Sequence, residues 1–87
     1  MNSVKITLNN SGGLHTRPAS LLVKNALQFK SHISIRCKNR EANAKRILGI
    51  LALGAQKGDE LEIFAEGPDA SLALDALRKL VEYEMVE

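Results

Sequence analysis

A histidine stands where a glycine-containing turn leads into an amphipathic segment. Residues 13–19 read GLHTRPA, which places His15 two residues before Arg17 and three before Pro18. The first backbone N–H groups of a helix have no partner within it and carry about half a positive charge, so they attract anions. Because proline is accepted in a first helical turn, the helix is predicted to start at Thr16 or at Pro18. Either start leaves His15 at its N-terminal end.

An imidazole at a helix N-terminus suits phosphoryl transfer. The positive helix end disfavours a second positive charge, so His15 is expected to be neutral near pH ~7, with one ring nitrogen free to act as a nucleophile. A phosphoryl group accepted there would meet the backbone N–H groups of Thr16 and Arg17 and the planar guanidinium of Arg17. A lone histidine near a helix start is more often a cap or a surface residue, and this alternative stays open at this point.

The composition is that of one small globular domain, expected to span residues 1–87. Hydrophobic residues make up 45% and aromatic residues only 3%, so the core must be aliphatic. No apolar run approaches the ~18 residues of a membrane span. The single cysteine, Cys37, excludes an intramolecular disulfide, and it forms no structural zinc spacing with the two histidines. We expect a cytoplasmic protein with no metal and no cofactor.

Charge is distributed unevenly along the chain. Residues 1–46 contain nine Lys/Arg and one acidic residue, whereas residues 47–87 contain three Lys/Arg and nine acidic residues. This pattern indicates either a solvated surface of mixed charge or a basic face that meets acidic partners or phosphate.

Alternating and helical patterns predict an α+β fold. Strands are expected at residues 4–8, 33–37, 41–44 and 60–66, with a hairpin tip at Asn39-Arg40. Helices are expected at residues 16–29 and 46–53, and a third is expected to begin after Asp69 as N-cap. The buried face of the third helix is predicted to be Leu72, Ala73, Ala76, Leu77, Leu80 and Val81. Each strand has one polar face, which favours an antiparallel sheet with helices on its other side.

The segment at residues 13–19 resembles the active-site histidine signature of HPr, the phosphocarrier family of the bacterial phosphoenolpyruvate-dependent sugar phosphotransferase system. The chain length, the order of elements, Ala44-Lys45-x-Ile47-Leu48-Gly49, Leu53-Gly54 and Lys57-Gly58 are similar as well. The resemblance covers essentially the whole chain. It implies an open-faced β-sandwich of four antiparallel strands with three helices on one face, in the order β-α-β-β-α-β-α.

The resemblance also implies roles for the two candidate residues. His15 would accept a phosphoryl group on Nδ1 from phosphorylated enzyme I and pass it to the IIA domain of a sugar permease. Arg17 would stabilise the phosphoryl group. Such a protein is a carrier rather than an independent enzyme.

The predicted second helix has more apolar residues than one buried face requires. We expect Ile47, Leu48 and Leu51 to divide between the core and an exposed apolar patch, although a fully buried helix would also explain them. In HPr this helix docks onto partners. The resemblance therefore implies a partner surface in which Lys24, Lys45 and Arg46 surround the patch with positive charge.

Two positions depart from the family. Arg46 stands where many HPr proteins carry a regulatory serine, so no regulatory serine is expected. Gly12 replaces the small polar residue usual before the active-site glycine, which removes a side-chain hydrogen bond near His15 and is expected to loosen the loop.

Other functions remain open from the sequence. The chain would also suit a carrier of a nitrogen-regulatory or dedicated paralogous phosphotransfer chain, and a non-catalytic α+β binding module is a further alternative. Nucleic-acid binding is disfavoured because the strands offer only Phe64 for stacking, with acidic residues beside it. We expect no membrane insertion and a monomer, with strand exchange into a dimer conceivable.

Overall fold

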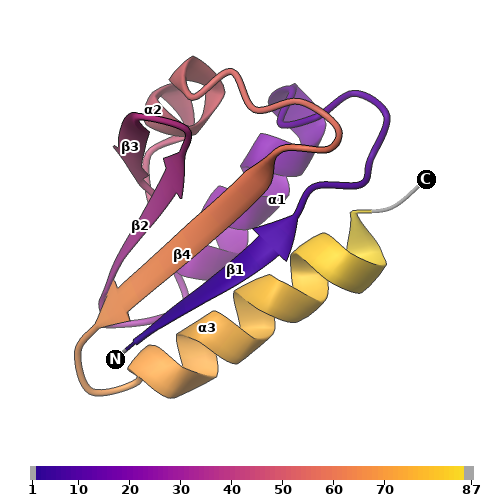
Figure 1. Ribbon diagram of the computed structural model, residues 1–87. Helices are drawn as coiled ribbons and strands as arrows, with labels where there is room; N and C mark the ends of the chain where they lie inside the picture. Colours follow the sequence, from indigo (N-terminus) through magenta and orange to yellow (C-terminus); the bar gives the residue numbers. More distant parts are fainter. Residues whose placement is uncertain (1, 86–87) are drawn as a thin grey trace.

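The computed structural model describes residues 2–85 and contains four strands and three α-helices (Figure 1). The elements follow one another as β1 (Ser3–Thr7), α1 (Thr16–Ala26), β2 (His32–Cys37), β3 (Arg40–Asn43), α2 (Ile47–Ala52), β4 (Glu60–Glu66) and α3 (Ala70–Lys79), which continues as the π-helical turn η1 (Leu80–Glu84). This is the predicted order of elements. No helix among the described residues is long and apolar enough to cross a membrane.

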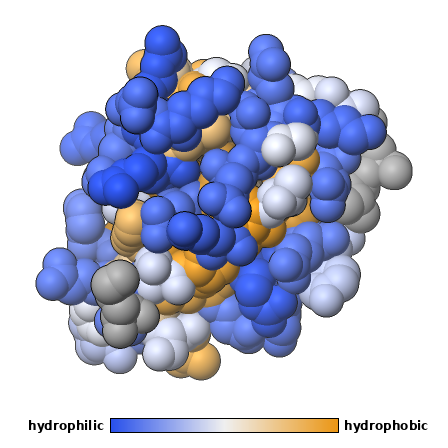
Figure 2. Space-filling model, in the orientation of Figure 1, coloured by the Kyte–Doolittle hydropathy of each residue, from blue (hydrophilic) through white to orange (hydrophobic). Residues whose placement is uncertain are grey.

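The four strands form one antiparallel sheet in the order β1-β4-β2-β3, and the three helices pack on one of its faces. Alternation along the strands produces the two faces. Ile35 of β2 and Ile63 of β4 are fully buried and pair with each other, whereas Lys5 of β1 and Glu60 of β4 are exposed. Figure 2, in the orientation of Figure 1, shows a mainly hydrophilic surface. The fold class predicted from the sequence is confirmed.

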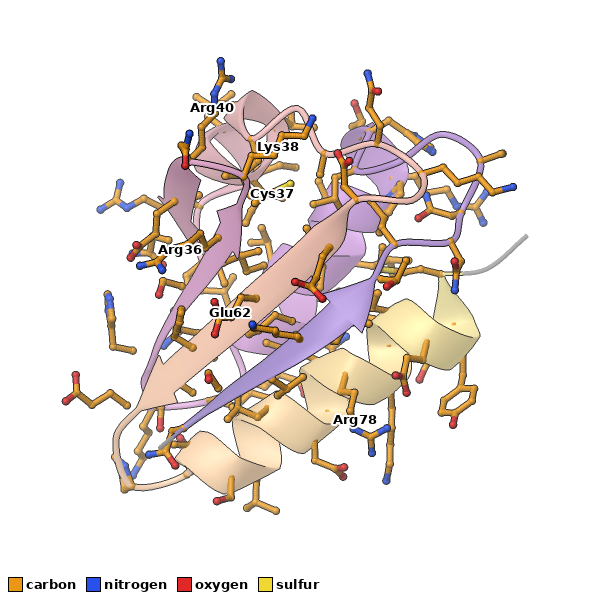
Figure 3. The ribbon with its side chains drawn as sticks, viewed as in Figure 1. Arg36, Cys37, Lys38, Arg40, Glu62 and Arg78 are labelled. Atoms are coloured by element: carbon orange, nitrogen blue, oxygen red, sulfur yellow. The ribbon has the colours of Figure 1, made fainter. Side chains whose placement is uncertain are left out.

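Basic side chains on the exposed side of β2 are already paired with carboxylates. Arg36 Nη2 lies 3.3 Å from Glu41 Oε1, and Lys38 Nζ lies 3.3 Å from Asp59 Oδ2. The Arg36 guanidinium also stacks 5.0 Å from the centre of the Phe64 ring. Figure 3 shows Arg36 beside β2 and Lys38 at the hairpin turn that follows this strand. Phe64 therefore contacts an arginine of its own sheet.

The predicted bounds differ by one residue at β1, β2 and α2 and were wrong for the first helix, the hairpin and the third strand. The first helix ends at Ala26 rather than at residue 29, because the chain turns at Leu27 and Phe29 N–H bonds the Ala26 carbonyl, three residues earlier. The hairpin tip is Lys38-Asn39 rather than Asn39-Arg40, because Cys37 pairs with Arg40 and Lys38 takes the left-handed turn conformation, with φ 59°. The third strand accordingly covers Arg40–Asn43.

The predicted buried face of the last helix was wrong at Leu72. This side chain is 68% exposed, whereas Leu74 is only 8% exposed and belongs to the core. The helix buries Ala70, Ala73, Leu74 and Leu77. Both leucines lie in an apolar run at the start of the helix, so periodicity alone could not decide which of them faces the sheet.

Asp69 is the N-cap residue of α3, as predicted, but its carboxylate makes no capping hydrogen bond to that helix. Oδ1 accepts hydrogen bonds from Ser31 N–H (2.9 Å) and Ser31 Oγ–H (2.6 Å), and Oδ2 accepts one from Lys30 N–H (2.9 Å). Asp69 therefore ties the loop between α1 and β2 to the start of α3. These hydrogen bonds, the Ser31 hydroxyl first, lower the pKa of Asp69 from 3.8 to about 2.

This lowered pKa predicts a loss of stability in acid. A carboxylate whose pKa is lower in the folded state stabilises the fold fully above its unfolded pKa, and the contribution disappears as the pH falls through the folded pKa. The free energy of unfolding should therefore decrease between pH 3.8 and about 2. Asp69→Asn should be less stable near neutral pH and should show a shallower decrease, which urea unfolding across this pH range would measure. An unchanged slope would contradict this role of Asp69.

Candidate functional site

The loop before α1 is held by backbone contacts that depend on Gly13. Its φ of 64° is in the left-handed region, and a Cβ there would collide with the Ala55 carbonyl oxygen and lie 2.8 Å from the Gln56 Cα. Leu14 N–H donates to the same Ala55 carbonyl at 3.0 Å, and the Leu14 side chain is buried. Asn10 Nδ2 donates to the Gly13 carbonyl at 2.6 Å. Residues 13 and 14 thereby anchor the position of His15.

His15 is the N-cap residue of α1 and is exposed to solvent. Its backbone is extended, with φ −83° and ψ −173°, and its carbonyl accepts the hydrogen bond from Ala19 N–H at 3.0 Å. The imidazole makes no capping hydrogen bond to the helix. His15 therefore occupies the N-cap position at the surface without a side-chain cap, and both ring nitrogens are available for other contacts.

The ring lies against Gly12 through one edge. A Cβ added at Gly12 would lie 2.6 Å from Nε2 of His15 and closer still to Cδ2. Because the Cδ2–Nε2 edge faces Gly12, Nδ1 lies on the opposite edge of the ring. We expected Gly12 only to loosen the loop. In the structure, the His15 ring also occupies the space that a side chain at position 12 would fill.

Two backbone donors are free beside the histidine. Helix α1 begins at Thr16, and among residues 2–85 no acceptor bonds the N–H of Thr16 or Arg17. The third helical residue, Pro18, has no N–H, and Ala19 N–H already bonds His15. The site thus presents two amides at the positive end of an eleven-residue helix.

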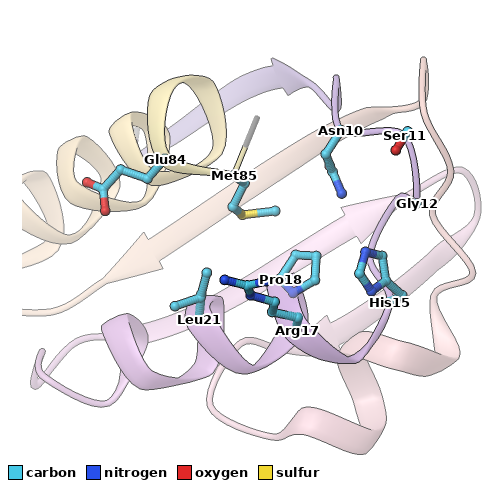
Figure 4. Close-up of a pocket in the computed structure, with 9 residues that line it drawn as sticks. All are labelled: Asn10, Ser11, Gly12, His15, Arg17, Pro18, Leu21, Glu84 and Met85. Atoms are coloured by element: carbon cyan, nitrogen blue, oxygen red, sulfur yellow. The ribbon is translucent and has the colours of Figure 1, made fainter. Parts of the chain in front are cut away.

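Arg17 and His15 share a cleft of about 480 Å³. Figure 4 shows both side chains on the α1 side of the cleft, with Glu84 and Met85 across from them. The Arg17 guanidinium is exposed and has no ion-pair or hydrogen-bond partner within the described chain. It is therefore available for an anion held near His15.

Five residues that line this cleft were not predicted from the sequence: Asn10, Ser11, Leu21, Glu84 and Met85. Asn10 is almost fully buried, at 2% exposed. A polar residue within a turn segment is ordinarily exposed, so the sequence did not indicate this burial. Glu84 and Met85 come from the last turn of the chain, almost seventy positions away, so no local spacing relates them to His15. Among residues 2–85 no group of three His, Cys, Asp or Glu side chains is placed to hold a metal ion.

The side chains of α2 divide as expected between the core and the surface. Ile50 is fully buried, Ile47 and Leu51 are half-buried, and Leu48 is 79% exposed. Leu21 of α1 is 36% exposed at the rim of the cleft. A fully buried second helix is therefore ruled out.

The basic residues predicted around this patch differ in their contacts. Lys24, in the last turn of α1, and Arg46, the N-cap residue of α2, are exposed. Lys45 is half-buried, and its Nζ donates to the Phe29 carbonyl at 2.7 Å. Lys45 therefore joins the start of α2 to the end of α1 and is less free than the other two. Neither helix contains an acidic residue.

A family model described as "PTS HPr component phosphorylation site" matches residues 2–83. The chain belongs to the HPr family. It is 41% identical over 78 residues to the phosphocarrier protein HPr of Treponema pallidum, which covers 90% of this chain and 89% of the relative. Members of this family are phosphocarriers of the phosphotransferase system.

Solved HPr structures have the same fold. A crystal structure of HPr from Thermoanaerobacter tengcongensis is 41% identical, covers 98% of this chain and 96% of its own, and superposes with a TM-score of 0.93. A structure described as an HPr dimer from the same organism covers all of both chains with a TM-score of 0.79. The family resemblance seen in the sequence is thus confirmed over the whole described fold.

Proposed function

We propose that this HPr-family chain accepts a phosphoryl group on Nδ1 of His15 from phosphorylated enzyme I and passes it to the IIA domain of a sugar permease. The Nδ1 lone pair attacks phosphorus and forms the N–P bond while the bond between phosphorus and its donor atom on enzyme I breaks. The proton on Nε2 stays on the ring. The reverse exchange of bonds, with an acceptor atom of the IIA domain, releases the imidazole.

The observation that carries this proposal is the exposed, uncapped imidazole of His15 beside the free N–H groups of Thr16 and Arg17. A phosphoryl group on Nδ1 brings negative charge to a helix N-terminus, where the amides and the macrodipole stabilise it. The uncommitted guanidinium of Arg17 offers two parallel donors to the phosphoryl oxygens. Catalysis by such preorganised donors needs no deep cavity.

Labelling with phosphoenolpyruvate tests this function. Incubated with phosphoenolpyruvate and enzyme I, the protein should gain one phosphoryl group that is labile in acid, as expected for phosphohistidine, and should lose it on addition of a IIA domain. An acid-stable phosphoester, or no label, would refute the proposal. Enzyme I of a sugar system and its nitrogen-regulatory counterpart, compared in parallel, would decide between the sugar pathway and the nitrogen-regulatory alternative by the faster transfer.

We further assign partner docking to the surface formed by Ile47, Leu48 and Leu51 with Lys24, Lys45 and Arg46. Leu48 and Arg46, two positions apart at the start of α2, are both exposed, and neither α1 nor α2 carries a carboxylate that would neutralise the basic side chains. Apolar contact flanked by positive charge suits rapid and reversible association with acidic partners.

Leu48→Glu should weaken binding to enzyme I about tenfold, because it removes apolar contact at the centre of this surface. Leu72→Glu is a matched control, since Leu72 is 68% exposed and also lies in the first turn of a helix, where an acidic residue is tolerated. Calorimetric titration of both variants with enzyme I would measure the effect. Equal affinities for the two variants would exclude this docking surface.

Arg46 predicts the absence of serine regulation at the start of α2. Arginine has no hydroxyl for a kinase to phosphorylate and places positive charge where phosphoserine would be negative. An ATP-dependent HPr serine kinase should therefore leave the protein unlabelled under conditions that label a serine-bearing HPr. Stoichiometric labelling would show that another serine has taken this role.

We expect the carrier to act as a monomer in the cytoplasm. A monomer leaves α1 and α2 open to successive partners. The dimer described for the Thermoanaerobacter tengcongensis relative makes strand exchange the alternative to exclude, and light scattering of the purified protein would distinguish the two states.

A further inference from the structure

The amide of Asn10 is buried beside the site and only half satisfied. Asn10 is 2% exposed, and its Nδ2 donates to the Gly13 carbonyl at 2.6 Å. This contact decides the orientation of the amide, because exchanging its two ends would bring two acceptor oxygens together. Within residues 2–85, Oδ1 is buried without a hydrogen-bond partner. A buried acceptor without a partner is unfavourable in a folded protein and points to a missing donor.

The imidazole of His15 lines the same cleft and lies against the same loop. Asn10, Gly12 and His15 line the cleft together, and Figure 4 shows the Asn10 side chain extending from the loop toward the His15 ring. The ring presents its Cδ2–Nε2 edge to Gly12. Nε2 is therefore the ring nitrogen on the side of the loop that carries Asn10, and Nδ1 is on the other side.

We propose that Asn10 is a positioning residue for His15. Its Oδ1 has no partner among the described residues of this structure, and it accepts a hydrogen bond from Nε2–H of the imidazole when the ring moves toward the loop. Gly12 provides the space for this arrangement, because any side chain there would occupy the volume of the ring. The inference deepens, and rests on, the proposed phosphoryl transfer at His15.

The contact has a chemical consequence for the nucleophile. A neutral imidazole carries its proton on one nitrogen and its available lone pair on the other. An acceptor at Nε2 holds the proton there, so the lone pair is kept on Nδ1. When Nδ1 forms the N–P bond, the donor bond to phosphorus breaks and the ring becomes a cation that still carries Nε2–H. A hydrogen bond from a charged donor is stronger, so Asn10 Oδ1 stabilises the phosphorylated ring more than the free one.

Nitrogen-15 NMR of the His15 ring tests the contact without any phosphoryl donor. At a pH where the imidazole is uncharged, the wild type should show the Nε2–H tautomer, and Asn10→Ala should raise the Nδ1–H fraction severalfold. Asn10→Asp keeps an acceptor oxygen but loses the amide donor to Gly13, so it should retain the wild-type tautomer. If Asn10 only holds the loop through its hydrogen bond to Gly13, Asn10→Ala and Asn10→Asp should show the same tautomer fractions. That result would overturn the proposal.

Gly12→Ala disturbs the same contact without changing Asn10, so its result does not depend on whether the Asn10 variants fold. Gly12 does not have a positive φ, so alanine is compatible with its backbone, but the new Cβ would displace the ring. This variant should show the same rise in Nδ1–H as Asn10→Ala. Asn9→Ala, a change at the exposed neighbouring residue, is the control and should match the wild type. Wild-type ring shifts in both Asn10→Ala and Gly12→Ala would refute the contact.

Rates of phosphoryl transfer, compared with the tautomer fractions, distinguish a failure of this inference from a failure of the proposed function on which it rests. Asn10→Ala should slow phosphorylation by enzyme I about fivefold, the effect of one ordinary hydrogen bond, and Asn10→Asp should restore most of the rate. If the wild type is not phosphorylated but the tautomers behave as described, the proposed function fails and the Asn10–His15 contact stands. If the wild type is phosphorylated and Asn10→Ala changes neither ring nor rate, the contact fails and the function stands.

Discussion

Replacing His15 with alanine should abolish phosphoryl acceptance from enzyme I while leaving the fold unchanged. The imidazole supplies the attacking lone pair, and nothing else in the cleft offers an unprotonated nitrogen nucleophile among the residues described. The side chain is exposed and makes no capping hydrogen bond, so its removal should leave the thermal unfolding midpoint within about 2 °C of the wild type. Acid-labile labelling and a melting curve on the same preparation would measure both effects.

His32→Ala is the matched control for this experiment. His32 is the only other histidine of the chain, and it is exposed at the start of β2. This variant should be labelled as fast as the wild type. Acid-labile labelling that persists in His15→Ala would move the phosphoryl acceptor to another residue, and full biological activity of that variant would favour the non-catalytic binding module.

Arg17→Ala should slow phosphorylation by enzyme I about 100-fold, the loss expected when one charged donor to a developing anion is removed. The guanidinium has no partner among residues 2–85, so the resting fold does not depend on it. Rapid-quench measurement of transfer, together with a melting curve, would separate the kinetic effect from any change in stability.

Two further arginine variants make the result specific. Arg17→Lys keeps the positive charge but loses the planar pair of donors, so its rate should fall between those of the wild type and Arg17→Ala. Arg36→Ala removes an exposed arginine from the far side of the sheet, where it pairs with Glu41, and should leave transfer unchanged. Equal rates for Arg17→Ala and Arg36→Ala would remove Arg17 from the site.

The basic side chains of the chain differ in whether an ion pair neutralises them. Arg36 and Lys38 are paired with carboxylates of the sheet region, and Arg78 and Lys79 are paired with acidic residues of α3 and η1. Arg17, Lys24 and Arg46 have no such partner among the ion pairs of residues 2–85. Within the described part of the chain, Arg17 and Lys24 of α1 and Arg46 at the start of α2 are thus unneutralised, as are Lys5 on β1 and Lys57 in the turn before β4.

Much of this protein could be predicted from its sequence because the relevant signals are local. Alternation in the strands, as at Leu61, Ile63 and Ala65, identified the buried face of the sheet correctly, since side chains of a strand point alternately to its two faces. The helix start beside His15 followed from glycine before it and proline after it. The prediction failed at Leu72, where two leucines fitted the helical pattern equally well. The N-cap position of Asp69 was predicted correctly, although its carboxylate bonds the distant Ser31 instead of the helix.

Local patterns of residues were enough to predict the element order, the helix end that bears His15 and Arg17, and the membership in a phosphocarrier family, because each depends on residues within a few positions of one another. Three contacts became visible only in the folded chain: the imidazole lies on Gly12, buried Asn10 and the turn η1 complete the cleft, and Lys45 bonds the Phe29 carbonyl. These contacts depend on how the helices pack on the sheet, and that packing brings together side chains whose separation along the chain carries no signal.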